Sequence, residues 1–505
     1  MKAKQKLKMK ERGITLIALV ITIIVLLILA SITIGAISGD NGILSNAGKA
    51  KVDTEISQEK EIIQTAAVQA IGDNIRGNLE QEEFQNQLNK IVGTNTTVEV
   101  ADLGEEFEVL FVENGRYYTV DKNANISDAK EIIKDNSPAD IATGKDGEEL
   151  EEGRYEIWSI EDLVVLSNIS RGKGNYMKDG EIVEATRDRF SGDTIYLMRT
   201  LNFNSWSSYS DLSITWSYDS EEDAYILDES SNKNLRELIT DEEGVGFIPI
   251  SENTGSGDLL FTGTFDGQNN EIQNLCENGS NGGLFSNVRN VTIKNLGLTN
   301  ININNTGSAG GIANRVNGGK LYNCYITGSI IGKQSGGLAT SIDGNSQVVN
   351  CYNAADIQSR NENGGGLTAY NDVSSNLTIV NSYNSGNVAT PVSWRSVSGI
   401  VGWVYNTGKR NIINTLSMGN LSSGMKVNTF YSVKGGATVE LENAYYLDTI
   451  VTDNTTINEN SIEFSKNSQE VLNTLNQYVK EHKNDYEVEL YSWKFDSEGL
   501  PTFEK

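Results

Sequence analysis

The clearest hydrophobic pattern of the chain is a continuous apolar run near its start. Residues 14–34 (ITLIALVITIIVLLILASITI) contain no charged side chain, and residues 1–12 before them carry six cations and one acid. At ~1.5 Å per residue, a helix of this length is about 31 Å long and matches the ~30 Å core of a bilayer. The pattern predicts a transmembrane or assembly helix over residues 14–38, which contacts the membrane through residues 14–34.

A second pattern predicts an α+β head over residues 39–135. Apolar residues recur at helical spacing within residues 47–92, which indicates one long helix. Three strand-like runs follow, and Asn114-Gly115 between the last two is a strong hairpin signal. These runs are Thr97–Ala101, Phe107–Val112 and Tyr117–Val120.

The composition changes after the head. Residues 136–154 are polar, acidic and rich in turn formers, which is typical of a linker. Residues 155–169 then indicate a strand followed by a short helix, with Ser159 and Asp162 spaced as a helix cap pair. We assign residues 155–280 to the N-terminal cap of a second structural unit.

That second unit contains an internal repeat. A Gly-aliphatic step recurs at spacings of 28, 26, 29 and 33 residues, and an asparagine closes the strand after each step. The glycines are Gly283, Gly311, Gly337, Gly366 and Gly399, and the asparagines are Asn295, Asn323, Asn350, Asn381, Asn414 and Asn443. Such a period, with three short strands in each repeat, indicates one coil of a β-helix.

The repeated asparagines have a physical reason within a stack of coils. Equivalent amides about 4.8 Å apart can hydrogen-bond along the stack, and asparagine tolerates the left-handed turn conformation. We therefore predict a mainly β protein with a right-handed β-helix, or solenoid, over residues 281–447. Residues 448–505 would form its C-terminal cap, including a polar helix that contains His482.

Composition excludes several functional classes. The 505 residues include 68 acidic and 41 basic side chains, a net charge of −27, which argues against a nucleic-acid partner. A single histidine and three cysteines exclude multi-histidine metal sites and disulfide-dense scaffolds. The coils differ from the rest, since residues 281–447 carry 11 basic and 6 acidic groups. An anionic surface glycan therefore remains a possible partner of the coils.

The charges also predict an orientation. Cations before the apolar run place that end in the cytoplasm, so the protein would be a single-pass cell-membrane protein whose C-terminal part is extracellular. The junction Glu11-Arg12-Gly13-Ile14 resembles the leader of type IV prepilins. The resemblance implies that a prepilin peptidase cuts residues 1–13 away between Gly13 and Ile14, and that Ile14 is then methylated.

The same resemblance implies other pilin-like subunits as partners, in a pilus or a secretion pseudopilus. The family usually has a glutamate at the fifth mature position, where it pairs with a neighbouring subunit's N-terminal amine. Ala18 stands there in this chain. Whether the protein enters a filament therefore stays open.

The repeat resembles that of GLUG-motif proteins. The matching steps are Gly283-Leu-Phe-Ser, Gly337-Leu-Ala-Thr and Gly399-Ile-Val-Gly. This resemblance implies a β-helix of the kind found in bacterial surface proteins, for which adhesion is the usual suggestion.

Two groups of side chains in the coils are candidate site residues. Asp343 and Asp372 have the same offset from the repeat glycine, so they would stack in adjacent coils, where paired carboxylates could bind a cation or act as acid and nucleophile. Arg360 is the nearest cation by repeat position. Two repeated Asx turns are the structural alternative.

Trp394, Trp403 and Tyr405 cluster in one coil and could stack on sugar rings, or could simply pack. Cys324 and Cys351 occupy matching places in neighbouring coils. They could form a disulfide, or a column of small buried side chains.

The function that the sequence favours is a minor or tip pilin-like protein that displays a β-helix for adhesion to a surface glycan or protein ligand. We assign it no catalytic residue, metal or cofactor. One alternative is a membrane-anchored polysaccharide-acting enzyme that uses Asp343 and Asp372. The other is a signal-anchored surface protein that never joins a filament.

Overall fold

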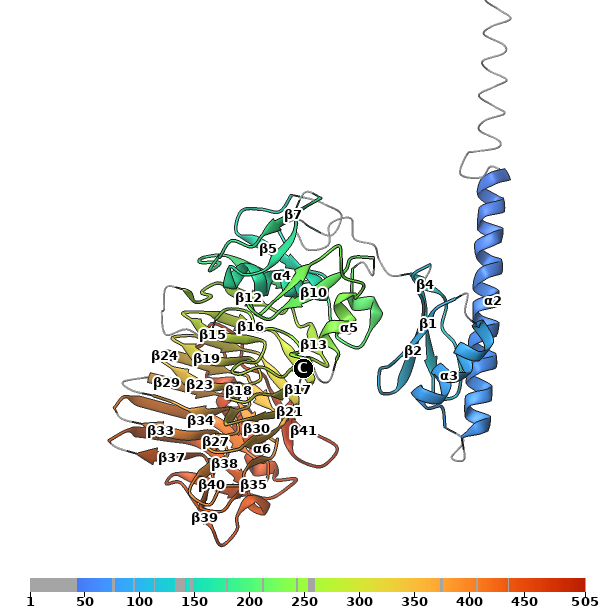
Figure 1. Cartoon of the computed structure of the whole chain (residues 1–505). Helices are drawn as coiled ribbons and strands as arrows, with labels where there is room; N and C mark the ends of the chain where they lie inside the picture. Colours follow the sequence, from blue (N-terminus) through green and yellow to red (C-terminus); the bar gives the residue numbers. More distant parts are fainter. Residues whose placement is uncertain are drawn as a thin grey trace, which may run out of the picture. The chain divides into compact units, whose positions relative to one another are not determined.

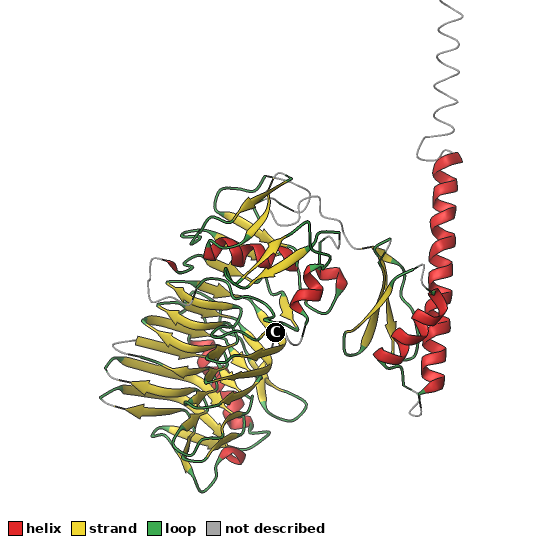
Figure 2. Ribbon diagram, viewed as in Figure 1, coloured by secondary structure: helices red, strands yellow, loops and turns green. Residues whose placement is uncertain are grey.

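The computed structural model describes residues 43–504, except 75–77, 94–95, 113, 132–140, 143, 145–148, 179, 211–212, 242–243, 253–258, 373–375, 406 and 435. The predicted cleavage site at Gly13 and Ile14 and the apolar run 14–34 lie outside these residues. None of the helices in the described ranges is long and apolar enough to cross a membrane. The described residues form two compact units, one ending at Lys130 and the other beginning at Glu131 (Figures 1 and 2).

The first unit packs two helices against a small sheet. Helix α2 (Ile43–Asp73) and helix α3 (Gln81–Val92) contribute Ile63, Ala66, Phe84 and Leu88 to a core shared with the strands. The prediction of one helix over residues 47–92 is wrong in its middle. Gly72, Asp73 and Asn74 are weak helix formers, and α2 ends among them.

The sheet of the first unit has the order β1-β2-β3-β4. Its strands are β1 (Val98–Asp102), β2 (Glu106–Phe111), β3 (Arg116–Asp121) and β4 (Lys130–Glu131). The predicted hairpin at Asn114-Gly115 is confirmed, since Phe111 pairs with Arg116 and Gly115 has a positive φ of 67°. Arg116 reaches α2, where its guanidinium forms an ion pair with Glu59 at 2.8 Å.

The second unit is a β-solenoid, so the predicted mainly β coil architecture is confirmed. Three stacks of parallel strands run along its axis (Figure 2). One six-stranded sheet contains β15 (Phe285–Arg289), β19 (Ala313–Asn317), β23 (Ala339–Asp343), β28 (Thr368–Tyr370), β33 (Val401–Tyr405) and β37 (Tyr431–Lys434). Another contains β18 (Ser308–Gly310), β22 (Gln334–Gly336), β27 (Gly364–Gly365), β32 (Ser396–Ser398), β36 (Lys426–Asn428) and β39 (Thr455–Thr456).

The third stack is a twenty-stranded sheet that also joins the caps to the coils. Its cap strands are β5 (Arg154–Ile157), β8 (Thr194–Leu197), β9 (Leu201–Asn202), β12 (Thr264–Asp266), β13 (Glu271–Gln273), β14 (Cys276–Glu277) and β40 (Ser461–Phe464). Its coil strands are β16 (Thr292–Lys294), β17 (Gly297–Asn304), β20 (Lys320–Tyr322), β21 (Tyr325–Gly332), β24 (Asn345–Val349), β25 (Tyr352–Asn353), β26 (Asp356–Ser359), β29 (Asn376–Val380), β30 (Tyr383–Asn384), β31 (Val388–Thr390), β34 (Lys409–Ser417), β35 (Leu421–Ser423) and β38 (Thr438–Leu447).

The register of this sheet reproduces the sequence repeat. Thr292 pairs with Lys320, Lys320 with Gln347, and Gln347 with Thr378. The inward side chains of successive coils, such as Ile293, Leu321, Val348 and Ile379, are completely buried. Each coil therefore covers the apolar face of the next.

The predicted asparagine column is also confirmed. We define the Asn ladder as Asn295, Asn323, Asn350, Asn381 and Asn414, all with φ between 48° and 55°. Each Nδ2 from Asn323 onward donates to the Oδ1 of the preceding rung at 2.8 Å. Asn443 shares the positive φ but is not joined by a side-chain hydrogen bond in the described part of the chain.

The two caps close the solenoid. The N-terminal cap contains helix α4 (Ile160–Arg171), whose predicted start is confirmed by a capping box between Ser159 and Asp162. It also contains two hairpins, β6 (Asn175–Lys178) with β7 (Glu181–Glu184) and β10 (Trp216–Asp219) with β11 (Ala224–Leu227), and helix α5 (Leu235–Ile239). The C-terminal cap contains helix α6 (Gln469–Glu481) and the hairpin of β41 (Trp493–Phe495) and β42 (Pro501–Phe503).

Candidate functional site

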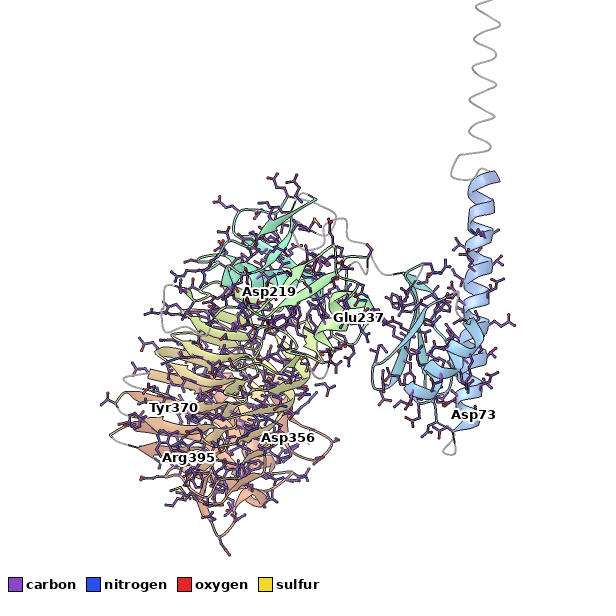
Figure 3. All side chains as sticks on the ribbon, in the orientation of Figure 1. Asp73, Asp219, Glu237, Asp356, Tyr370 and Arg395 are labelled. Atoms are coloured by element: carbon purple, nitrogen blue, oxygen red, sulfur yellow. The ribbon has the colours of Figure 1, made fainter. Side chains whose placement is uncertain are left out.

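The structure brings the two predicted aspartates together, but through a backbone contact. The N–H of Asp372 donates to Oδ1 of Asp343 at 2.7 Å. Oδ2 of Asp343 accepts from the Ser341 hydroxyl and forms an ion pair with Nε of Arg315 at 2.9 Å. With these three partners the buried Asp343 carboxylate is well satisfied, which favours a structural role in the coils. In Figure 3 the labelled Tyr370 marks this edge of the coils, and its hydroxyl donates to Asp372.

Two cations lie beside this column, Arg315 on the Asp343 carboxylate and Arg410 on the following turn, and Arg360 is not one of them. The buried Arg410 guanidinium donates from Nε to Oδ1 of Asn371 and from Nη2 to the Asp372 carbonyl at 3.1 Å. Burial lowers the pKa of Arg410, and the charges of Asp343 and Asp372 oppose that shift. Arg360 instead donates to the carbonyl of Asn305. Arg410 therefore holds the turns of this column together.

The predicted aromatic group is divided between a turn and a strand. Trp394 precedes β32 and is 64% exposed, while Trp403 and Tyr405 lie half-buried on β33. In the described coils no ring contact joins Trp394 to Trp403.

The cysteines are not bonded to one another. Cys324 and Cys351 are free and buried, and Sγ of Cys351 accepts the N–H of Cys324 at 3.4 Å. The disulfide alternative is therefore wrong, and the column of small buried side chains is confirmed. Burial raises the pKa of the Cys351 thiol.

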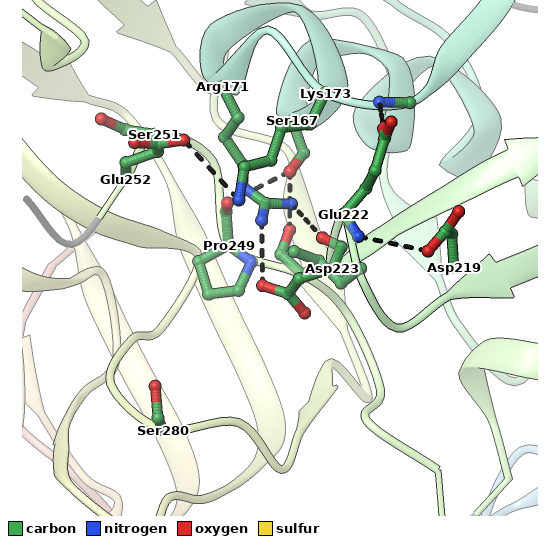
Figure 4. A network of polar contacts seen from close by, with 12 residues as sticks. Ser167, Arg171, Lys173, Asp219, Glu222, Asp223, Pro249, Ser251, Glu252 and Ser280 are labelled. Atoms are coloured by element: carbon green, nitrogen blue, oxygen red, sulfur yellow. Dashed lines mark hydrogen bonds and ion pairs between the residues drawn. The ribbon is translucent and has the colours of Figure 1, made fainter.

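A cavity that the sequence did not suggest lies where the N-terminal cap meets the first coils. Its volume is about 540 Å³. The lining comes from the end of α4, the β10–β11 hairpin, residues 245–252 and residues 277–286. We call it the Glu277 cavity, and Figure 4 shows the polar network at its wall.

Glu277 is the central group of this cavity. It occupies an inward position, because β14 pairs it with the buried Ile303, and its side chain is only 1% exposed. Oε2 accepts from Nδ2 of Asn305 at 2.7 Å, whereas Oε1 has no hydrogen-bond partner among the described residues. Burial raises the pKa of Glu277 to about 8, and the Asn305 amide and the nearby Gly279 backbone N–H only partly offset this. At neutral pH the carboxyl is therefore mostly protonated.

Arg171 also lines the cavity. It is the last residue of α4, and its guanidinium donates to the carbonyl of Asp223 at 2.7 Å and to its carboxylate at 2.9 Å (Figure 4). Burial lowers the pKa of Arg171, and the Asp223 charge opposes this. Nearby, Lys173 lies 3.8 Å from the carboxylate of Glu252. These charges compensate one another, so the cavity wall is close to neutral.

The remaining lining is amphipathic. Phe247, Ile248 and Pro249 supply apolar surface, and the buried Ser286 hydroxyl has no partner among the described residues. A protonated carboxyl both donates and accepts, as does a serine hydroxyl. The arrangement suits a neutral ligand that carries hydroxyl groups on an apolar frame. No group of three or more acidic, histidine or cysteine side chains that could hold a metal occurs in the described residues.

No protein-family model matches the chain, and no curated protein matches it. A crystal structure of a candidate immunoglobulin A1 protease from Bacteroides ovatus aligns with a TM-score of 0.46 and 18% identity, over 70% of this chain and 92% of that one. A structure named IgA1 Protease aligns with a TM-score of 0.40 and 15% identity, over 73% of this chain but only 27% of its own length. Likeness at this level carries no argument about activity.

Proposed function

We propose that this β-solenoid protein is a cell-surface binding protein that recognises a hydroxyl-rich ligand, such as a surface glycan, in the Glu277 cavity. The observation that carries the proposal is the buried carboxyl of Glu277 at the wall of a cavity of about 540 Å³, since its Oε1 has no partner in the described residues. Burial also raises the pKa of this group to about 8, which favours the protonated form. A buried polar atom of this kind is costly unless a ligand or water satisfies it.

In this proposal, the N-terminal part of the chain attaches the solenoid to the cell surface. Its basic leader, the Gly13–Ile14 junction and the apolar run 14–34 resemble a prepilin, so a pilin-like module would hold the solenoid outside the membrane. In this arrangement the solenoid serves adhesion. The N-terminal residue of the mature protein tests this part, because Ile14 with a methylated amine is expected and an intact Met1 would contradict it.

The binding step is tested with the full chain on an array of neutral and acidic glycans. We expect a neutral glycan to bind at pH 6.5 and its affinity to fall at least tenfold at pH 9, because Glu277 then carries a buried charge. Glu277→Gln keeps the shape without ionising, so its affinity should be similar at both pH values. Glu442→Gln, on the exposed part of β38, is the matched control and should behave as wild type.

A variant that blocks the cavity tests ligand binding without depending on the protonation of Glu277. Ser280 is exposed at the rim of the cavity, so Ser280→Trp should reduce glycan binding without disturbing the core. If no glycan binds, or if Ser280→Trp binds as well as wild type, the proposal is wrong. An enzyme that uses Asp343 and Asp372 would instead degrade a glycan and lose that activity in Asp372→Asn.

A further inference from the structure

The flank of the solenoid that carries the Asn ladder is covered along only part of its length. The C-terminal segment from Glu489 to Trp493 crosses the ladder at Asn350 and Asn381, which we call the covered rungs. It does not contact Asn295 and Asn323, the open rungs, through any hydrogen bond in the described residues. This difference lies outside the Glu277 cavity and does not depend on the function proposed for it.

Each covered rung makes four hydrogen bonds, two along the ladder and two to the segment. Nδ2 of Asn350 donates to the Glu489 carbonyl at 2.8 Å, and its Oδ1 accepts the N–H of Tyr491 at 3.1 Å. Nδ2 of Asn381 donates to the Tyr491 carbonyl at 3.0 Å. Three of the four bonds to the segment thus involve its backbone, and the fourth comes from the Trp493 indole N–H.

The open rungs use only their ladder bonds. Asn323 donates to Asn295 at 2.8 Å, and Asn295 donates to Asp266 at 3.0 Å. The second amide N–H and a second lone pair of each have no protein partner within the described part of the chain. A cavity of about 340 Å³ lies over them, lined by Asn269, Asn295, Asn323 and the rings of Tyr325 and Tyr491.

We propose that the open rungs bind the backbone of an extended peptide from another polypeptide, in the same way that the covered rungs bind residues 489–491. The protein's own segment is the template, since it shows which backbone groups this ladder accepts. With coils about 4.8 Å apart and about 3.3 Å per extended residue, the two open rungs span roughly three residues. Tyr325 and Tyr491 flank this stretch, so an apolar side chain would lie between the rings.

The probe for this site is a fluorescent peptide with the sequence of residues 487–493, EVELYSW, blocked at both ends. We expect saturable binding to the full chain by fluorescence anisotropy. The same peptide methylated on its central backbone nitrogens should bind at least tenfold more weakly, because it cannot donate to the asparagine oxygens. No saturable binding, or equal binding of the methylated peptide, would overturn the proposal.

A matched pair of variants locates the binding. Asn269 and Asn290 are both exposed and have positive φ values of 63° and 49°, which aspartate tolerates. Asn269→Asp replaces a donor at the edge of the cavity by a charge that repels carbonyl oxygens, and should weaken the peptide at least fivefold. Asn290→Asp makes the same change away from the cavity and should leave the affinity unchanged.

Three results would contradict this placement. Equal affinity in the Asn269 variant and wild type would place the peptide elsewhere, for example on the covered rungs after displacement of the C-terminal segment. Equal weakening in both variants would indicate a non-specific charge effect. Saturable binding of a neutral oligosaccharide that Asn269→Asp abolishes, with no peptide binding, would assign the cavity to a sugar.

Discussion

The Asn ladder and the Glu277 cavity differ in how far their buried polar groups are hydrogen-bonded. In the ladder, the buried Asn381 uses both amide protons and both lone pairs of its side-chain oxygen. In the cavity, Glu277 is equally buried but has one oxygen without a partner in the described residues. The ladder obtains its partners from repetition, because the same side chain lies one coil away. The cavity lies where the coils meet an irregular cap, and no repeat supplies a partner there.

This comparison separates stability from recognition. A column of asparagines paired from coil to coil contributes to one well-defined register, because a slip of the register would break these side-chain hydrogen bonds. An unpaired buried carboxyl costs folding free energy, and such costs are most often retained at functional sites. We therefore expect substitution in the ladder to lower the free energy of unfolding, and substitution of Glu277 to raise it.

The largest expected effect is the loss of a central ladder rung. Asn381→Ala removes four hydrogen bonds and leaves groups of Asn350, Asn414, Tyr491 and Trp493 short of a partner. Since each unsatisfied buried group costs about 1–3 kcal/mol, not fully additively, the free energy of unfolding should fall by about 4 kcal/mol. Urea titration followed by tryptophan fluorescence measures it.

Asn443→Ala is the matched control for that experiment. Asn443 has the same backbone conformation, with a φ of 46°, but no side-chain hydrogen bond in the described coils. Its substitution should cost only the strain of alanine in the left-handed region, about 1 kcal/mol. If both variants lose the same stability, the ladder bonds contribute nothing and the comparison fails.

Replacement of Glu277 should instead stabilise the folded protein at high pH. Its pKa of about 8 in the folded protein lies above the ordinary value of 4.5. The proton is therefore bound more tightly in the folded state. The resulting stability is fully present below about pH 4.5 and is lost as pH rises through 8. We expect Glu277→Gln to be more stable than wild type at pH 9 by about 3 kcal/mol, less than the full shift implies because water and relaxation ease a buried charge.

The control for this prediction is the same comparison at low pH. At pH 5 both side chains are neutral in the folded protein, so the advantage of glutamine should shrink to below about 1 kcal/mol. Urea midpoints of wild type and variant at the two pH values supply the measurement. A constant difference between the two proteins across this range would mean that Glu277 does not titrate with a raised pKa.

The contrast between the two regions also explains what could be predicted from sequence. The spacings between successive repeat asparagines gave the coil lengths, and the strand register from Thr292 to Asn411 follows them. The hairpin at Asn114-Gly115 and the cap at Ser159 were predictable because their determinants lie within a few residues. The helix break after Asp73 was missed because apolar spacing continues on both sides of it.

The Glu277 cavity could not be predicted, because long-range contacts build it. Asn168 donates to the Tyr225 carbonyl at 2.9 Å, and the Tyr225 hydroxyl donates to the carbonyl of Gly246 at 2.8 Å, which places the β10–β11 hairpin beside the coil. No local pattern encodes those pairings. The one available signal was Glu277 itself, an acid at an inward strand position. The repeat did align Asp343 with Asp372, but the Asp343 carboxylate is satisfied by Arg315, Ser341 and the Asp372 backbone.

The smallest expected effect concerns the segment that covers the ladder. The rings of Tyr352 and Tyr383 stack at 4.7 Å, Phe503 lies 5.2 Å from Tyr383, and the Tyr383 hydroxyl contacts the Thr502 hydroxyl at 2.9 Å. Tyr383→Phe keeps the stack and removes only that hydrogen bond, so it should cost about 1 kcal/mol. A double-mutant cycle with Thr502→Val should give a coupling energy of similar size in urea titrations. A coupling near zero would mean that ring packing and the asparagine contacts alone hold the C-terminal segment, and the covered rungs would then differ from the open ones only by those contacts.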